Sequence, residues 1–246
     1  MSRSIHAVLF DLGNTLMYSP AAWPPIFDEA GKAMGAYLHS KGIELDAAAL
    51  SKEFRRRLVQ YYTERERSML ETTSLLILED MLAEQGLPDL PRSLLRAALD
   101  EYYAVTQTNW LIENDTIATL SQLRADSLHI GMVSNASDSR DVLALVDKFG
   151  IREYFDFILV SADCGYRKPH PRIFELALSN WGYMPDEIAM VGDRLDADIS
   201  GARPLGIYTI WIKRRAKEIT TPVPVAPNAT VQTLSEIPLL LSERFK

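Results

Sequence analysis

Asp11 lies where an apolar run, residues 5–10, gives way to the small and polar residues 12–15. This pattern is typical of a buried strand that ends in a turn and presents one carboxylate at its carboxyl end. A carboxylate in that place can act as a nucleophile or bind a metal ion. Taken alone, Asp11 is explained equally well as a turn or capping residue.

Three further segments place a polar side chain at the end of an apolar run or just before a helix. In chain order they contain Ser134-Asn135, Lys168 and Asp193, with Asp198 soon after. Each of these residues alone could be a helix cap or a solvated side chain. Because the carboxyl ends of parallel strands meet at one edge of a sheet, the set as a whole predicts one shared site.

The acidic residues of this set fit a magnesium site. Mg²⁺ prefers oxygen ligands and keeps some of its waters. We expect Asp11, Asp193 and the backbone carbonyl of Gly13 to bind the ion, and Asp198 to orient its waters or the Lys168 side chain. A bound ion would neutralise the repulsion between Asp11 and an anionic substrate.

The same residues fit phosphoryl transfer. Phosphate monoesters are anionic and hydrolyse slowly, so catalysis depends on charge neutralisation and positioning. We expect Asp11 to attack the phosphorus atom and to form an aspartyl-phosphate, which water then hydrolyses. Ser134, Asn135 and Lys168 are expected to bind the phosphoryl group of a small phosphorylated metabolite.

The four segments resemble, in order, the four motifs of the haloacid dehalogenase-like (HAD) hydrolase superfamily. These motifs are an aspartate, a Ser or Thr, a Lys, and a paired acidic motif of the form GDxxxxD, here residues 192–198. Each motif is weak alone, but the ordered set extends over residues 5–212. The resemblance implies a Rossmann-like core, an aspartate nucleophile at Asp11 and, in the phosphatase branch, a requirement for magnesium.

Gly13 departs from the phosphatase pattern. In the usual phosphatase form of this superfamily the residue two positions after the nucleophile is a second aspartate, which protonates the leaving group and later activates water. Glycine can do neither, and such general acid–base help contributes a factor of about 10² to 10⁴. A substrate with a low-pKa leaving group, such as a sugar 1-phosphate or an acyl phosphate, would need it least.

Two alternatives to a phosphatase follow from Gly13. The superfamily contains 2-haloacid dehalogenases, which lack the second aspartate and need no metal, but Gly192-Asp193 retains the metal-type motif that those enzymes replace. The chain could also be a catalytically weak relative that uses the fold to bind a ligand or a protein. The retained Asp11, Lys168 and Asp193 argue against that interpretation, because a binding module does not need them.

The elements that must position these residues form two patterns. Residues 20–110 are rich in helix-forming residues at helical spacing and predict a small bundle of three or four helices. After residue 114, apolar strands alternate with helices, which predicts a doubly wound parallel α/β sheet. We therefore expect a Rossmann-like core of residues 1–16 and 113–246, and an inserted α-helical cap of residues 17–112 that closes over Asp11. The expected strands after the first are 128–133, 155–160, 187–191, 206–211 and 230–234, and the expected helices are 114–126, 138–149, 171–182, 197–204 and 235–243.

Composition restricts the partners. The chain has 246 residues and a formal net charge of −7, which gives no electrostatic reason to expect nucleic acid or a membrane surface as partner. The single cysteine, Cys164, is expected to be a small buried filler. No signal peptide or membrane span is predicted, so we expect a cytoplasmic protein; no oligomeric state is predicted. The basic and aromatic residues of the second cap helix are expected to form a solvated face rather than to contact substrate: Arg55, Arg56, Arg57, Tyr61, Tyr62, Arg65 and Arg67.

Overall fold

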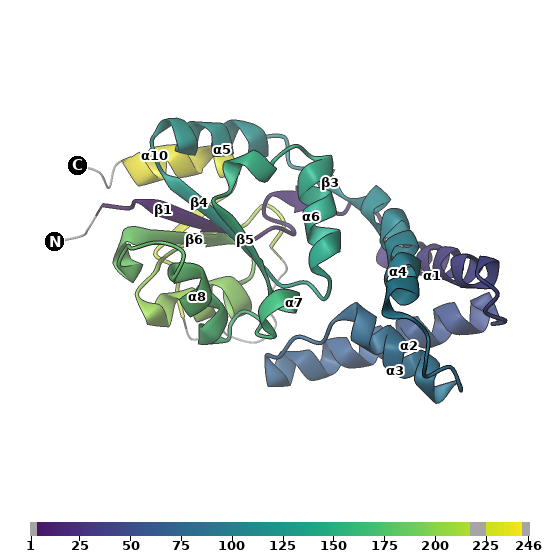
Figure 1. The fold of residues 1–246 in the computed structure, drawn as a ribbon. Coiled ribbons are helices and arrows are strands. Elements are labelled where there is room, and N and C mark those ends of the chain that lie inside the picture. Colours follow the sequence, from purple (N-terminus) through teal and green to yellow (C-terminus); the bar gives the residue numbers. More distant parts are fainter. Residues whose placement is uncertain (1–3, 217–224, 243–246) are drawn as a thin grey trace.

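The computed structural model describes residues 4–216 and 225–242 (Figure 1). Its larger lobe is built on a six-stranded sheet in the order β5-β4-β1-β6-β7-β8, in which every neighbouring pair is parallel. The predicted doubly wound parallel sheet is thereby confirmed. The strands of this sheet are β1 (Ala7–Phe10), β4 (His129–Ser134), β5 (Phe157–Val160), β6 (Ile188–Gly192), β7 (Tyr208–Ile212) and β8 (Ala229–Val231).

The sheet is covered on both faces, which is why its central strands are apolar without interruption. Along β1, Val8 and Phe10 join one hydrophobic cluster, and Ala7 and Leu9 join another on the opposite face. The first cluster includes side chains of α5 (Thr116–Ala125) and α10 (Ile237–Ser242), and the second includes side chains of α8 (Pro171–Leu178). Figure 1 shows these helices on opposite sides of the sheet.

Three shorter or more peripheral helices complete the larger lobe: α6 (Ser139–Lys148), α7 (Ser161–Cys164) and α9 (Ser200–Ala202). Helix α6 follows β4, and α7 follows β5 directly. Both lie on the side of the sheet nearest the smaller lobe, as Figure 1 shows, whereas the described ends of the chain lie at the far side. The carboxyl edge of the sheet therefore faces the smaller lobe.

The smaller lobe contains four helices around a hydrophobic core of its own. Asp46 caps the second of them by accepting a hydrogen bond from the backbone N–H of Ala48 at 2.8 Å. The helices are α1 (Trp23–Ser40), α2 (Ala47–Ser68), α3 (Ser74–Glu84) and α4 (Arg92–Thr106).

Two short antiparallel strands, β2 (Met17–Tyr18) and β3 (Leu111–Ile112), connect the lobes. The expected domain boundaries at 16/17 and 112/113 lie at the beginning of β2 and at the end of β3. The division into two domains stays a prediction, and the helical insertion is called the cap below.

Three segments differ from the elements expected from the sequence. The helix expected at 171–182 ends at Leu178, because the chain turns there through hydrogen bonds from Asn180 N to Ala177 O and from Trp181 N to Leu178 O. The helix expected at 197–204 is a wide π-type turn over Leu195–Ile199, followed by α9 and a tight turn that contains Pro204. Proline has no N–H to continue a helix. The strand expected at 230–234 ends at Val231, because Glu236 accepts a hydrogen bond from the backbone N–H of Thr233 at 2.8 Å and begins a helical turn there.

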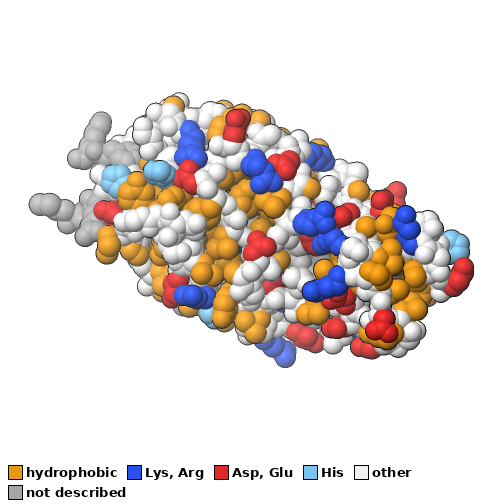
Figure 2. Space-filling model, viewed as in Figure 1, with side chains coloured by type: hydrophobic (Ala, Val, Ile, Leu, Met, Phe, Trp, Pro, Cys, Tyr) orange, Lys and Arg blue, Asp and Glu red, His pale blue; other side chains and the backbone are white. Residues whose placement is uncertain are grey.

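Charged side chains of both signs are interspersed over the face that Figure 2 shows. Among the described residues, no helix is both long and apolar enough to cross a membrane.

The contact between α1 and α2 depends on Gly35. A Cβ atom added at this position would lie 2.7 Å from Cβ and 2.9 Å from Cα of Ala47. For Gly35→Ala, overpacking costs about 1–3 kcal/mol, whereas the better helix propensity of alanine returns about 1 kcal/mol. We expect a net loss of about 1 kcal/mol and a lower Tm in thermal unfolding. Gly182→Ala is the control, since a Cβ there meets nothing within 4 Å; an equal Tm for both variants would contradict this account.

Candidate active site

Three carboxylates meet at the carboxyl edge of the sheet. Asp11 follows β1 and Asp193 follows β6, and the pairing of Phe10 with Val191 in the two strands brings them side by side. Asp198 comes from the wide turn that follows. One oxygen atom from each of the three carboxylates lies within 4.8 Å of the others.

The ammonium group of Lys168 lies among these carboxylates and is almost fully buried. Its Nζ atom is 2.6 Å from Asp11 Oδ1, 2.7 Å from Asp198 Oδ1 and 2.7 Å from the backbone oxygen of Val133. The contacts with Asp11 and Val133 are hydrogen bonds, and the contact with Asp198 is a buried ion pair. Burial disfavours the charged form, but the attraction of Asp11 and Asp198 outweighs it and raises the pKa of Lys168 above its ordinary value.

Asn135 holds the backbone of Lys168 in place. Its Oδ1 atom accepts a hydrogen bond from Lys168 N at 2.8 Å, and its Nδ2 atom donates one to Lys168 O at 2.9 Å. The sequence predicted Asn135 as a substrate ligand, whereas here both polar atoms of its side chain bind the protein. Asn135 is therefore a positioning residue in this structure, and the sequence contained no signal for its pairing with a segment more than thirty residues away.

Gly192 explains how Asp198 comes so close to the sheet. A Cβ atom at position 192 would lie 2.1 Å from Asp198 Oδ2, so a side chain there is excluded. The backbone N–H of Arg194 donates a hydrogen bond to the same oxygen at 3.0 Å. The glycine of the GDxxxxD pattern thus makes room for its last aspartate.

The three carboxylates of Asp11, Asp193 and Asp198, called the acidic group below, outnumber the single ammonium group of Lys168. Burial, followed by repulsion from Asp11 and Asp198, raises the pKa of Asp193 to about 8. Burial also raises the pKa of Asp198, to about 6, although Lys168 acts against that shift. Three carboxylates with one oxygen each within 4.8 Å of the others form a donor set suited to a hard divalent cation.

The turn after β1 holds the second oxygen of Asp11. Thr15 Oγ1 donates a hydrogen bond to Asp11 Oδ2 at 3.2 Å, and the backbone of Leu16 closes the turn by donating to Leu12 O at 2.9 Å. Asn14 adopts a left-handed conformation with φ of 61°, one that asparagine tolerates better than most residues. This turn explains the small and polar residues that the sequence places after Asp11.

A cavity of about 190 Å³ lies above the acidic group. It is smaller than the usual range of about 300–1,000 Å³ for pockets that take drug-sized ligands, which favours a small substrate. The predicted residues Asp11, Gly13, Ser134, Asn135, Lys168, Asp193 and Asp198 all line it. Residues that the sequence did not single out line it too, among them Trp110 and Asp141.

Trp110 covers Gly13. A Cβ atom added at Gly13 would lie 3.3 Å from Cη2 and 3.8 Å from Cζ3 of the indole. The ring thus lies against the place where the second aspartate of the phosphatase pattern would begin. Trp110 immediately precedes β3, so the residue that fills this place comes from the connection between the lobes.

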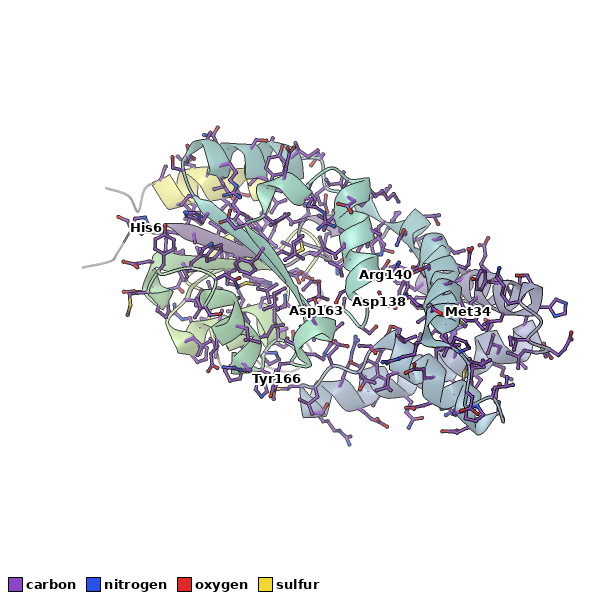
Figure 3. All side chains as sticks on the ribbon, in the orientation of Figure 1. His6, Met34, Asp138, Arg140, Asp163 and Tyr166 are labelled. Atoms are coloured by element: carbon purple, nitrogen blue, oxygen red, sulfur yellow. The ribbon has the colours of Figure 1, made fainter. Side chains whose placement is uncertain are left out.

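The cap is docked on the core around this cavity. The buried carboxylate of Glu71, between α2 and α3, pairs with Arg167 and accepts a hydrogen bond from Ser161. The backbone N–H of Glu71 donates to Gly165 O at 2.9 Å. Arg96 on α4 pairs with Asp138, which Figure 3 labels on the side of the core that faces the cap. These contacts hold the cap against the core, and Arg167 also lines the cavity.

Two other polar residues of the motif segments have structural roles. Asp196 is exposed and pairs with Arg194, and His170 caps α8 by accepting a hydrogen bond from Arg172 N at 3.1 Å. The expectation that Cys164 is buried is wrong: it is half-buried, because it ends the short helix α7 and its thiol contacts the backbone of Tyr166.

The expected solvated face of α2 is only partly correct. Arg55 and Arg56 carry mostly exposed ion pairs, and Arg57 pairs with Glu53 and Glu84. Arg65 instead lines the cavity and Tyr61 is buried, because both lie on the side of α2 that faces the core.

Comparisons with known proteins agree with the fold and the motifs. A family model described as haloacid dehalogenase-like hydrolase matches residues 5–206. The glyceraldehyde 3-phosphate phosphatase of Methanopyrus kandleri is 30% identical over 212 residues, which cover 85% of this chain and 84% of that protein. The ribulose-1,5-bisphosphate 5-phosphatase of Halopiger xanaduensis is 30% identical over 207 residues, 83% of each chain. The structure of a 2-haloacid dehalogenase from Pseudomonas syringae pv. tomato has a TM-score of 0.64 at 25% identity, and the match covers 97% of this chain and 99% of that one.

The chain belongs to the haloacid dehalogenase-like hydrolases. The resemblance stated from the sequence motifs is thereby confirmed.

The raised pKa of Asp193 predicts how stability depends on pH. The pKa of this carboxyl group rises from an ordinary value of 3.8 to about 8 in the folded protein, so between these values the folded state holds the extra proton. Stability of the metal-free protein therefore falls as pH rises through this window. Asp193→Asn removes the penalty, and we expect it to stabilise the protein more at pH 8 than at pH 5. Thermal unfolding in the presence of a chelator measures this, and an equal effect at both pH values would refute it.

Proposed function

We propose that the protein is a magnesium-dependent phosphatase that hydrolyses a small phosphorylated metabolite through an aspartyl-phosphate on Asp11. The observation that carries the proposal is the buried group of Asp11, Lys168, Asp193 and Asp198 at the floor of a small cavity. The phosphatase names of the two relatives that match more than four fifths of the chain support it.

The donor set assigns the metal ligands in this proposal. Asp11 and Asp193 and the backbone carbonyl of Gly13 would hold Mg²⁺, with Asp198 outside this set because its oxygens contact Lys168 and the Arg194 N–H. When bound, the ion supplies positive charge that offsets the repulsion between Asp11 and the incoming phosphate.

The residues of the chain perform the transfer as follows. Lys168 holds Asp11 through Oδ1, and the Ser134 hydroxyl hydrogen-bonds a phosphoryl oxygen. Asp11 attacks phosphorus, a P–O bond to its carboxylate forms, and the bond to the leaving oxygen breaks with its electron pair. Water then attacks the aspartyl-phosphate, which releases inorganic phosphate and restores the carboxylate.

The source of the proton for the leaving oxygen differs from that of the usual phosphatase site, because Gly13 has no acidic side chain. The leaving oxygen therefore departs as an anion or takes its proton from solvent. Departure as an anion is easiest for groups of low pKa, which favours sugar 1-phosphates and acyl phosphates as substrates.

Two observations are compatible with the dehalogenase alternative, namely Gly13 and the structural neighbour from P. syringae. Asp193 is against it, because it adds a third carboxylate to Asp11 and Asp198. That set is suited to a cation, and dehalogenation needs no cation.

Replacement of the nucleophile is the main test. We expect Asp11→Asn to lower phosphate release from phosphorylated metabolites by at least about 10³-fold, and removal of Mg²⁺ to do the same for the wild type. Asp126→Asn is the matched control, since that exposed carboxylate accepts a hydrogen bond from Gln122 at the surface and does not line the cavity. Turnover that survives Asp11→Asn would rule out the nucleophile, and chloride release from 2-chloropropionate without metal would support the dehalogenase.

The absence of an acid at Gly13 predicts a gain of function. Gly13→Asp should raise the hydrolysis of alkyl phosphates, which are poor leaving groups, by up to about 10²-fold relative to acetyl phosphate. Because the indole lies 3.3 Å from the added Cβ, the gain should be larger when Trp110→Phe is also present. Trp110→Phe alone serves as the control. Lower rates on both substrate classes in the single and double variants would show that the site depends on the glycine.

A further inference from the structure

Arg65 brings a guanidinium group from the cap to the cavity that contains Asp11 and Lys168. It lies in the last turn of α2, and its guanidinium carbon is 4.0 Å from the ring centre of Tyr62 and 5.4 Å from that of Tyr61. Stacking on two rings restricts the orientation of the group without neutralising it.

No carboxylate pairs with Arg65 in the part of the chain that the structure describes, and its buried Nε atom has no hydrogen-bond partner there. The cap arginines that pair with carboxylates are Arg55, Arg56, Arg57, Arg92 and Arg96. A buried polar group without a partner costs free energy, and a charged one costs more. Burial, followed by repulsion from Arg167, lowers the pKa of Arg65, in keeping with an uncompensated charge.

The carboxylate of Glu71, which lies beside Arg65, already has other partners. Glu71 Oε2 binds Arg167 and Ser161, and Oε1 accepts a hydrogen bond from Tyr61. Glu71 therefore neutralises the charge of Arg167, and the charge of Arg65 stays uncompensated.

The other carboxyl group on this side of the cavity does not balance Arg65 either. Asp141 accepts a hydrogen bond from Gln107 at 2.9 Å, and burial raises its pKa to about 7, so that much of it is uncharged near neutral pH. The cavity thus has an acidic floor, suited to a cation and a phosphoryl group, and one unpaired cation on the cap side.

We propose that Arg65 binds a second oxyanion of the substrate, a carboxylate or a phosphate, at the end opposite the phosphoryl group that Asp11 attacks. The inference rests on the proposed phosphatase function and specifies its substrate class. A guanidinium group binds either oxyanion through two parallel N–H···O bonds. The small volume of the cavity limits the distance between the two anionic groups to that found in a small metabolite.

This arrangement discriminates strongly against analogues with an anionic group at one end only. A substrate that lacks the second oxyanion leaves the half-buried guanidinium of Arg65 unpaired. Sites built for a polar group reject analogues without it far more strongly than apolar pockets reject a missing methylene. The preference is therefore carried by Arg65 rather than by the acidic floor, which every phosphate monoester contacts alike.

Matched substrate pairs test the inference. The first pair is 3-phosphoglycerate and glycerol 3-phosphate, which differ in a carboxylate against a hydroxymethyl group. The second is propane-1,3-diol bisphosphate and its monophosphate, which separates a phosphate from a carboxylate as the second oxyanion. We expect the wild type to favour the member with two anionic ends in at least one pair, by at least about tenfold in kcat/KM. Arg65→Met should lower kcat/KM for that member by about 10–100-fold and leave its partner within about threefold.

The controls separate charge from folding. Arg67→Met changes an exposed arginine of the same helix and should leave the preference intact. Arg65→Lys retains the charge without the planar fork and should restore part of the preference. The inference is overturned if the wild type shows no preference in either pair, or if Arg65→Met lowers kcat/KM equally for both members of a pair. Turnover in either case still supports the phosphatase.

A binding measurement decides the matter if neither pair releases phosphate, because both pairs have the alkyl leaving groups that a site without an acid at Gly13 hydrolyses poorly. Phosphate release from acetyl phosphate tests the proposed function separately. Calorimetric titration of 3-phosphoglycerate and of propane-1,3-diol bisphosphate into Asp11→Asn should show binding of at least one that Arg65→Met weakens at least about tenfold. Equal affinities with and without Arg65 overturn the inference.

Discussion

The Lys168 ammonium group is bonded to Asp11, Asp198 and the backbone of Val133 in a place from which water is almost excluded. Three carboxylates gathered at the ends of parallel strands repel one another, and without this cation the group would have to take up protons or open to solvent. Asn135 and Gly192 both serve this arrangement, the first by holding the Lys168 backbone and the second by admitting Asp198. Much of the local structure at the sheet edge therefore follows from placing one ammonium group.

The cavity joins surfaces of different origin and different charge. The sheet edge supplies a floor with more carboxylates than cations, whereas the cap supplies Arg65 and the connection supplies Trp110. The two sides are held together by the buried pair of Glu71 and Arg167, which crosses from one lobe to the other. In the proposed function, the floor carries out the reaction and the cap side selects the substrate.

Gly13 and Trp110 have to be considered together. In the sequence, Gly13 stands where the usual phosphatase has the aspartate that protonates the leaving group. In the structure the indole of Trp110 lies against that position, so the place is filled by a side chain from a distant part of the chain. The site is therefore built differently from that of the usual phosphatase, with an apolar surface where the second carboxylate would be.

The sequence by itself determined the parallel sheet, the helical insertion and the order of Asp11, Ser134, Lys168 and Asp193, because apolar periodicity and strand-end chemistry are local signals. Tertiary structure decided what depends on contacts between distant segments. The Asn135 side chain hydrogen-bonds the backbone of Lys168, and Trp110 covers Gly13. Arg65 lines the cavity, whereas Arg57 of the same helix pairs with Glu84 of the cap. Residues of the same type on one helix differ only in the direction they face, and packing of the cap on the core sets that direction.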